Sequence, residues 1–128
     1  MDRNLDDLRP EFRTLVDTWL TGMKLANLDH IITCTVRTDA EQAALYASGR
    51  TVTGPIRTYA KPGQSAHQYG LAIDFCIVDL GKLLDWSGDD PSWDQAIKIA
   101  QASGLESLRP MESAHLQHPG WRTIAGVT

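Results

Sequence analysis

A single carboxylate stands inside an apolar run of the chain, at Asp74 between Ile73 and Phe75. An ionised side chain is costly to bury unless a partner neutralises it. A divalent metal ion would do so, and catalytic zinc takes three protein ligands from among histidine, thiolate and carboxylate, with one position left for water. The setting of Asp74 therefore predicts a metal site, whereas pairing with an arginine or capping of a turn is the simpler alternative.

His67, seven residues before Asp74, is the first candidate for a second ligand. Gly70 lies between them and lets the backbone turn without a side-chain clash, so that a histidine at a loop end and an aspartate on a strand can converge. A lone histidine is more often only hydrogen-bonded, and the spacing leaves the third ligand open. The remaining histidines are His30, His115 and His118.

Glu112 precedes His115 by three residues and could act as the proton acceptor beside a metal-activated water. In a straight strand this spacing places two side chains on opposite faces, so the pair can work together only if the chain bends between them. Without that bend both are ordinary surface residues.

The elements that must position these residues begin with a helix and a strand. Apolar residues recur at steps of three and four as far as Met23, which predicts a helix that begins near Pro10. The β-branched stretch HIITCTV, residues 30–36, predicts a strand that ends at Arg37. That arginine either pairs with Asp39 or lies at the edge of a binding site.

A second helix is predicted directly after this arginine, because Thr38 and Glu41 form a capping box and Gly49 supplies an end. Gln42 lies in its first turn. Residues 50–64 contain two glycines and two prolines without sustained periodicity, which predicts a loop long enough to have a function.

The second half of the chain predicts two more strands around a helix. LAIDFCIVD, residues 71–79, alternates so that Asp74 faces away from the large apolar side chains. Asp90 opens a helix that Gly104 can end, and SAHLQH reads as a short strand. The order of elements predicts a single α+β domain spanning residues 1–128.

Composition narrows the classes of function. The net charge is −4 and no lysine or arginine cluster runs along the chain, which argues against a nucleic-acid-binding surface. No signal peptide or apolar run of membrane-spanning length is visible, so we expect a protein made in the cytoplasm. Cys34 and Cys76 are expected to be buried free thiols, unless their strands prove to be neighbours.

The stretch SAHQYGLAID resembles the Ser-x-His-x-x-Gly-x-Ala-x-Asp signature of zinc peptidases that cut peptidoglycan stem peptides, the family of D-Ala-D-Ala carboxypeptidases and L-alanyl-D-glutamate endopeptidases. VRTDAEQAALYASGRT is similar to the family segment in which an arginine precedes a glutamine on a helix. The downstream Glu-x-x-His of the family corresponds to ESAH here. The resemblance covers about residues 31–117.

The resemblance implies a small antiparallel sheet flanked by helices, the hedgehog/DD-peptidase-like fold, and one bound zinc ion. It implies zinc ligation by His67, Asp74 and His115, with Glu112 as general base and Arg37 beside the oxyanion. The substrate-binding residues it implies are Arg37, Gln42 and Ser65.

The resemblance also implies hydrolysis of peptidoglycan stem peptides, and KPGQSAH is similar to the segment that precedes the first ligand in phage lysis enzymes of this group. We expect an L-alanyl-D-glutamate endopeptidase that acts as a monomeric endolysin, without a separate cell-wall-binding domain. It would reach the periplasm or wall after release, with a holin as the export partner. The alternatives are a D-Ala-D-Ala carboxypeptidase or dipeptidase and a non-catalytic zinc-stabilised binding module.

Overall fold

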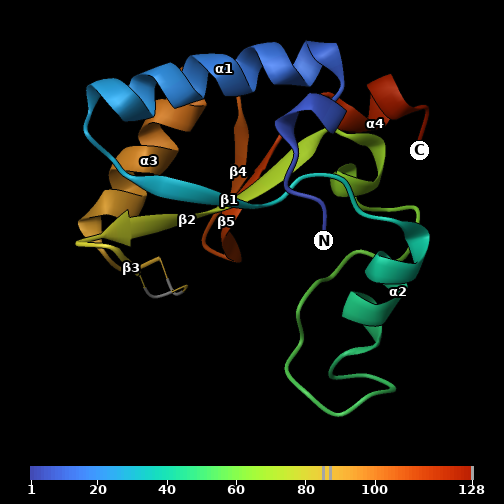
Figure 1. Cartoon of the computed structure of the whole chain (residues 1–128). Helices are drawn as coiled ribbons and strands as arrows, with labels where there is room; N and C mark the ends of the chain where they lie inside the picture. Colours follow the sequence, from blue (N-terminus) through green and yellow to red (C-terminus); the bar gives the residue numbers. More distant parts are fainter. Residues whose placement is uncertain (85, 87, 128) are drawn as a thin grey trace.

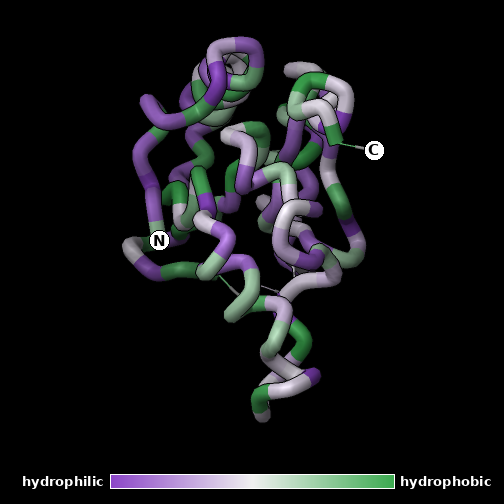
Figure 2. Tube along the Cα trace, turned by 90° about the vertical axis from the view of Figure 1, so that its right-hand side faces the viewer, coloured by the Kyte–Doolittle hydropathy of each residue, from purple (hydrophilic) through white to green (hydrophobic). Residues whose placement is uncertain are grey.

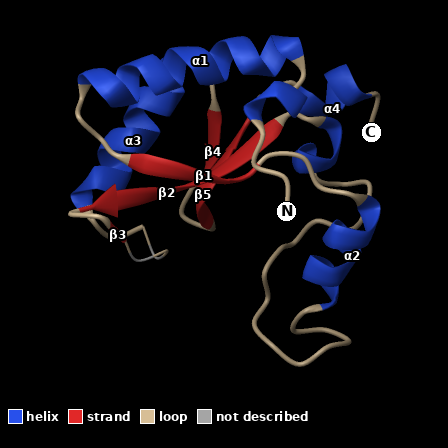
Figure 3. Cartoon of the chain, viewed as in Figure 1, coloured by secondary structure: helices blue, strands red, loops and turns tan. Residues whose placement is uncertain are grey.

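The computed structural model describes residues 1–84, 86 and 88–127, and its centre is an antiparallel sheet. Four strands follow the order β1-β2-β5-β4, and the short β3 pairs with β2. The strands are β1 (His30–Cys34), β2 (Ala72–Asp79), β3 (Lys82–Leu83), β4 (Glu106–Leu108) and β5 (Glu112–Gln117). The predicted small antiparallel sheet flanked by helices is confirmed (Figure 3).

Two long helices, α1 (Pro10–Leu25) and α3 (Pro91–Ala102), cover one face of this sheet (Figure 1). The apolar stripe of α1 meets the large side chains of β2, and the rings of Trp19 and Phe75 lie 5.0 Å apart. Trp93 of α3 packs on the same phenylalanine at 5.1 Å. This core occupies the face of β2 opposite Asp74, as the alternation of its residues predicts.

The predicted helix starts are confirmed. Pro10 begins α1, and Asp90 caps the start of α3 by accepting a hydrogen bond from the backbone of Ser92. Helix α2 (Asp39–Ala47) begins with the complete capping box of Thr38 and Glu41.

Helix α2 and the following loop stand away from the body of the protein (Figures 1 and 2). Gln42 ties this projection together, because its side-chain amide donates to the carbonyl oxygen of Ala60 at 2.7 Å. Ser48 donates to the Pro55 carbonyl oxygen, also at 2.7 Å. The loop that the sequence predicts over residues 50–64 is therefore held by specific hydrogen bonds.

Some elements differ from the prediction. Strand β1 ends at Cys34 rather than residue 36, because the backbone N–H of Thr35 donates to the Asp2 carbonyl oxygen instead of to β2. The sequence pattern did not reveal β3, β4, helix α4 (Trp121–Ala125) or the 3-10 turns η1 (Leu5–Asp7) and η2 (Ala66–Tyr69). All of these are too short to display a hydrophobic period.

Both cysteines are buried free thiols, as predicted. Cys76 lies opposite Ile31 across the β1–β2 pair, whereas Cys34 lies opposite Asp74, so the two thiols do not share a register position. No helix in the described part of the chain is long and apolar enough to cross a membrane.

Candidate active site

Pairing of strands β2 and β5 brings two of the candidate ligands, Asp74 and His115, together. Asp74 and His115 are direct partners in the antiparallel register, so their side chains lie on the same face of the sheet. His67 reaches the same point from the turn η2. Gly70 ends that turn at φ 70°, and a Cβ there would lie 3.2 Å from the backbone nitrogen of Arg9.

Three ligand atoms form a nearly equilateral triangle. Asp74 Oδ1 lies 3.1 Å from His67 Nε2 and 3.3 Å from His115 Nδ1, and the two nitrogens lie 3.2 Å apart. Tetrahedral zinc with ligand bonds of 2.0–2.1 Å requires ligand atoms about 3.3 Å from one another. The three side chains therefore fit three corners of a zinc tetrahedron and leave the fourth corner open.

The outer hydrogen bonds of both histidines direct their lone pairs into this triangle. His67 Nδ1 lies 2.7 Å from the Thr35 carbonyl oxygen, which can only accept, so this nitrogen carries the proton and Nε2 is bare. His115 Nε2 lies 2.8 Å from Gln117 Oε1. The amide of Gln117 donates on its other side to Glu106, which fixes its oxygen toward His115. Hydrogen bonds of this kind orient metal-binding histidines.

The charges at the triangle also favour a cation. Burial lowers the pKa of His67 and keeps this imidazole neutral. Burial raises the pKa of Asp74, but its contacts with the rings of His67 and His115 outweigh this effect and hold that pKa below its ordinary value. Burial lowers the pKa of His115, but the carboxylate of Asp74 outweighs it and raises the pKa. An ionised aspartate thus faces two imidazoles.

Arg37 occupies the other oxygen of the same aspartate. Its Nη2 donates to Asp74 Oδ2 at 2.8 Å, and its Nη1 donates to Gln42 Oε1 at 3.2 Å. Pairing of Asp74 with an arginine and its place in the ligand triangle are therefore compatible, because each uses a different oxygen. Arg37 does not pair with Asp39 in the described ion pairs.

The three predicted substrate-binding residues have different positions. Arg37 and Ser65 line a cavity beside the triangle. Ser65 also caps η2 by accepting a hydrogen bond from the His67 backbone at 3.4 Å. Gln42 is fully buried behind Arg37 and does not line that cavity, so it has a supporting position rather than one in contact with a substrate.

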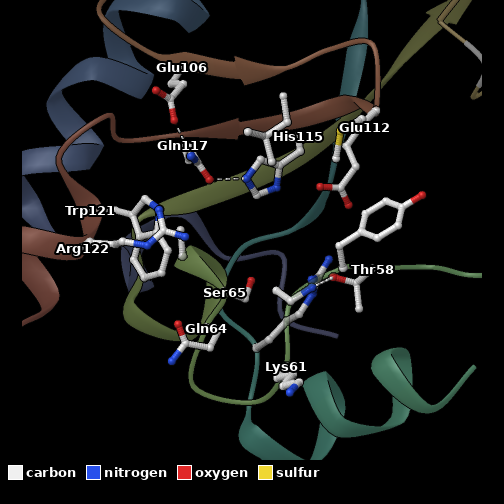
Figure 4. A pocket seen from close by; sticks show the side chains of 16 residues that line it. Thr58, Lys61, Gln64, Ser65, Glu106, Glu112, His115, Gln117, Trp121 and Arg122 are labelled. Carbon is white, nitrogen blue, oxygen red and sulfur yellow. Dashed lines mark hydrogen bonds between the residues drawn. The ribbon is translucent and has the colours of Figure 1, made fainter. Parts of the chain in front are cut away.

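The cavity space beside the triangle has two parts. One, of about 470 Å³, extends toward α4 and is called here the α4 arm; it is lined in part by Lys61, Gln64, Glu106, Trp121 and Arg122 (Figure 4). The other, of about 500 Å³, extends toward β1 and is called the β1 arm; it is lined in part by Thr33, Leu45, Ile56, Arg57 and Trp86. The two arms share Arg37, Glu112 and His115, so they meet at the triangle.

A bulge in β5 brings Glu112 to this junction. Leu108 of β4 pairs with Glu112, yet the preceding residue Ser107 pairs with Leu116, so residues 113–115 have no counterparts in β4. Such a bulge bends the strand and re-aims its side chains. This is the bend that the spacing of Glu112 and His115 requires, and both side chains border the same cavity (Figure 4).

The structure also decides which of the three remaining histidines is the third candidate ligand. The ring of His30 packs on Trp19 at 5.0 Å, and His118 accepts a hydrogen bond from the Gly120 backbone at 2.9 Å. His115 alone among the three joins Asp74. Sequence reasoning missed the supporting roles of Gln117 and Thr35, because a carbonyl oxygen and an amide in the outer layer have no spacing signature.

Comparison with known proteins places the chain in a family. A family model described as VanY, D-alanyl-D-alanine carboxypeptidase, matches residues 6–117. The chain belongs to the VanY family. The resemblance inferred from the SAHQYGLAID motif is therefore confirmed.

One curated relative is the peptidoglycan L-alanyl-D-glutamate endopeptidase CwlK of Bacillus subtilis (strain 168), which is 34% identical over 107 residues. The match covers 78% of this chain and 64% of the relative, so the chain spans less than two thirds of that protein.

Solved structures share the VanY-type fold. The L-Ala D-Glu endopeptidase ChiX of Serratia marcescens superposes with a TM-score of 0.66 at 16% identity, covering 91% of this chain and 84% of the other. The LD-carboxypeptidase LdcB superposes with a TM-score of 0.68 at 20% identity, covering 94% and 65%.

A second group of candidate ligands needs to be weighed against the triangle. Atoms of Cys34, His67 and Asp74 lie within 4.8 Å of one another. Burial raises the pKa of the Cys34 thiol, which opposes the thiolate form that binds metals. The triangle with His115 is tighter and has its lone pairs prepared, so it is the better-built site.

Proposed function

We propose that this VanY-family chain is a zinc-dependent peptidase that hydrolyses peptidoglycan stem peptides, with the ion held by His67, Asp74 and His115. The observation that carries the proposal is the triangle of ligand atoms, 3.1–3.3 Å apart, with both histidines hydrogen-bonded on their outer nitrogens. Three lone pairs directed at one point repel one another unless a cation lies between them.

The protein's own side chains divide the remaining tasks. Bound zinc would supply Lewis acidity, which makes water more acidic and a carbonyl carbon more electrophilic. The carboxylate of Glu112 would take the proton from the attacking water and pass it to the departing amine nitrogen. Arg37, at the junction of both arms, would lie beside the developing oxyanion while its bond to Asp74 keeps that ligand oriented.

The form of the cleft supports an endopeptidase. An endopeptidase must hold substrate on both sides of the scissile bond, and both arms open from the junction at Glu112 and His115. The relative CwlK is an L-alanyl-D-glutamate endopeptidase by its description. We therefore propose the bond between L-Ala and D-Glu. The description of the family model favours a second candidate, D-Ala-D-Ala carboxypeptidase activity.

Further parts of the proposal concern the biological setting. The KPGQSAH segment supports a role as a phage or prophage lysis enzyme that acts on the wall as a monomer after release through a holin. Glu112 at the junction argues against a binding module without catalysis, since such a module has no use for a carboxylate there. Lysis of wall-exposed cells by added protein, compared with the Glu112→Gln variant, tests this setting.

Digestion of purified peptidoglycan by the zinc-loaded protein tests the reaction. Mass spectrometry of the products should reveal new D-Glu amino ends, and the Glu112→Gln variant should produce none. Release of D-Ala would instead support the carboxypeptidase. No new ends of either type would contradict the proposed function.

A further inference from the structure

Two cations without an ion-pair partner in the described part of the chain line the α4 arm. Lys61 and Arg122 both line this arm, and neither forms an ion pair with a carboxylate in the described part of the chain. Arg37, the cation that the sequence predicts to bind substrate, is already paired with Asp74 at 2.8 Å. The positive charge available to a ligand therefore lies away from the junction.

A packed aromatic unit connects the two elements that carry these cations. The buried ring of Trp121 stacks on Tyr69 at 5.8 Å, and the Tyr69 hydroxyl donates to the Gly63 carbonyl oxygen at 2.7 Å. This contact fixes the turn that carries Lys61 against α4. The Arg122 guanidinium lies over the Trp121 ring at 4.5 Å, a cation–π contact that restrains its direction.

The remaining charges of the arm limit where an anion can bind. Glu106 and Glu112 also line it, and like charges close together are unfavourable. A carboxylate would therefore avoid the strand side of the cavity and bind near Lys61 and Arg122. In Figure 4, Glu106 and Glu112 come from the strands, Arg122 lies beside Trp121, and Lys61 lies beyond Gln64 and Ser65. A guanidinium can bind a carboxylate through two parallel hydrogen bonds, and an ammonium adds a point charge.

We propose that the α4 arm is a recognition site for a free carboxylate of the substrate, with Lys61 and Arg122 as its specificity-determining residues. This inference rests on the proposed function. A glutamyl residue in a peptide always has one carboxyl group outside the chain, so the D-Glu side of the scissile bond supplies this anion. The D-Glu half then occupies the α4 arm, and the L-Ala half occupies the β1 arm.

The test compares two synthetic stem peptides that differ only in the free carboxyl group of D-Glu, which is ionised in one and amidated in the other. The zinc-loaded protein should cleave the ionised peptide with about ten-fold higher kcat/KM, through a lower KM, because a bond between charged partners is lost in the amide. Arg122→Ala and Lys61→Ala should each reduce this preference several-fold, and Arg122→Lys should retain part of it.

Two other variants serve as comparisons for this test. Lys98→Ala removes the same charge from the exposed surface of α3 and should leave the preference unchanged. Arg57→Ala removes a cation that lines the β1 arm and not the α4 arm. Loss of the preference in Arg57→Ala but not in Arg122→Ala would overturn the proposal, because the carboxylate would then lie in the other arm.

The same measurement separates this inference from the proposed function. Equal cleavage of both peptides by the unaltered protein would overturn the carboxylate site and leave the peptidase proposal standing. Cleavage of neither peptide would contradict the proposed endopeptidase itself, and the inference with it.

Discussion

The two arms of the cleft are similar in size but differ in how the chain builds them. The α4 arm is lined by residues 58–61 and 64 of the projecting loop and by β4, β5 and α4, and the stack of Trp121 on Tyr69 joins α4 to the turn that follows this loop. The β1 arm is bordered partly by the projecting loop, from which Ile56 and Arg57 come. The comparison teaches that a charged group can be recognised precisely in the α4 arm, whereas the β1 arm suits a less specific contact.

The largest expected effect lies where the arms meet. Glu112→Gln should lower kcat by about 10³-fold or more, because it removes the proton acceptor that both halves of the substrate depend on. Zinc binding should persist, since Glu112 is not one of the triangle residues. Steady-state kinetics and metal analysis of the same preparation measure both. If the variant keeps a near-normal kcat, Glu112 is not the general base.

A smaller effect is expected from the outer layer of the α4 arm. Gln117→Ala removes the acceptor that keeps the proton of His115 on Nε2, so zinc affinity should fall about 10–100-fold. Competition with a chromophoric chelator measures this affinity. Gln101→Ala, on the exposed surface of α3, is the matched control. Equal zinc affinities in the two variants would show that Gln117, which lines the α4 arm, does not support the metal centre.

The β1 arm is tested by changing the substrate on the L-Ala side. A peptide with a free amino group on L-Ala should be cleaved about ten-fold less efficiently than its N-acetyl form, because the ammonium would lie in the arm that Arg57 lines with a like charge. The ratio of kcat/KM for the two peptides measures the effect. A preference for the free amine would reverse the assignment of the arms.

The smallest effect is expected at Cys34, the thiol that borders the β1 arm. Burial raises its pKa, so the neutral thiol should contribute nothing to zinc binding. Cys34→Ser should therefore bind one zinc ion with affinity within about two-fold of the unaltered protein. Loss of binding in this variant would favour the ligand group that includes Cys34.

The comparison also explains what the sequence could predict. Helix starts depend on local groups, so Pro10, Asp90 and the Thr38 capping box were visible in the sequence. The alternation around Asp74 likewise predicted its face of the sheet. The strand register that places Asp74 opposite His115 depends on long-range pairing, and residue spacing alone left the third ligand open among three histidines.

The parts that the sequence did not predict depend on tertiary contacts. Nothing local indicated that Arg37 would pair with Asp74, 37 positions away, or that Gln42 would be buried against Ala60. The short helix α4 has too few residues for a hydrophobic period, so the position of Arg122 in the cleft was not predicted either. The motif thus predicted which three side chains form the triangle, while the two arms could be identified only from the fold.

X-ray absorption spectroscopy of the protein with one equivalent of zinc tests the central claim most directly. The account predicts a shell of only nitrogen and oxygen near 2.0–2.1 Å, with the scattering of two imidazoles, from the triangle of His67, Asp74 and His115. A sulfur scatterer at about 2.3 Å, or a single imidazole, would contradict it.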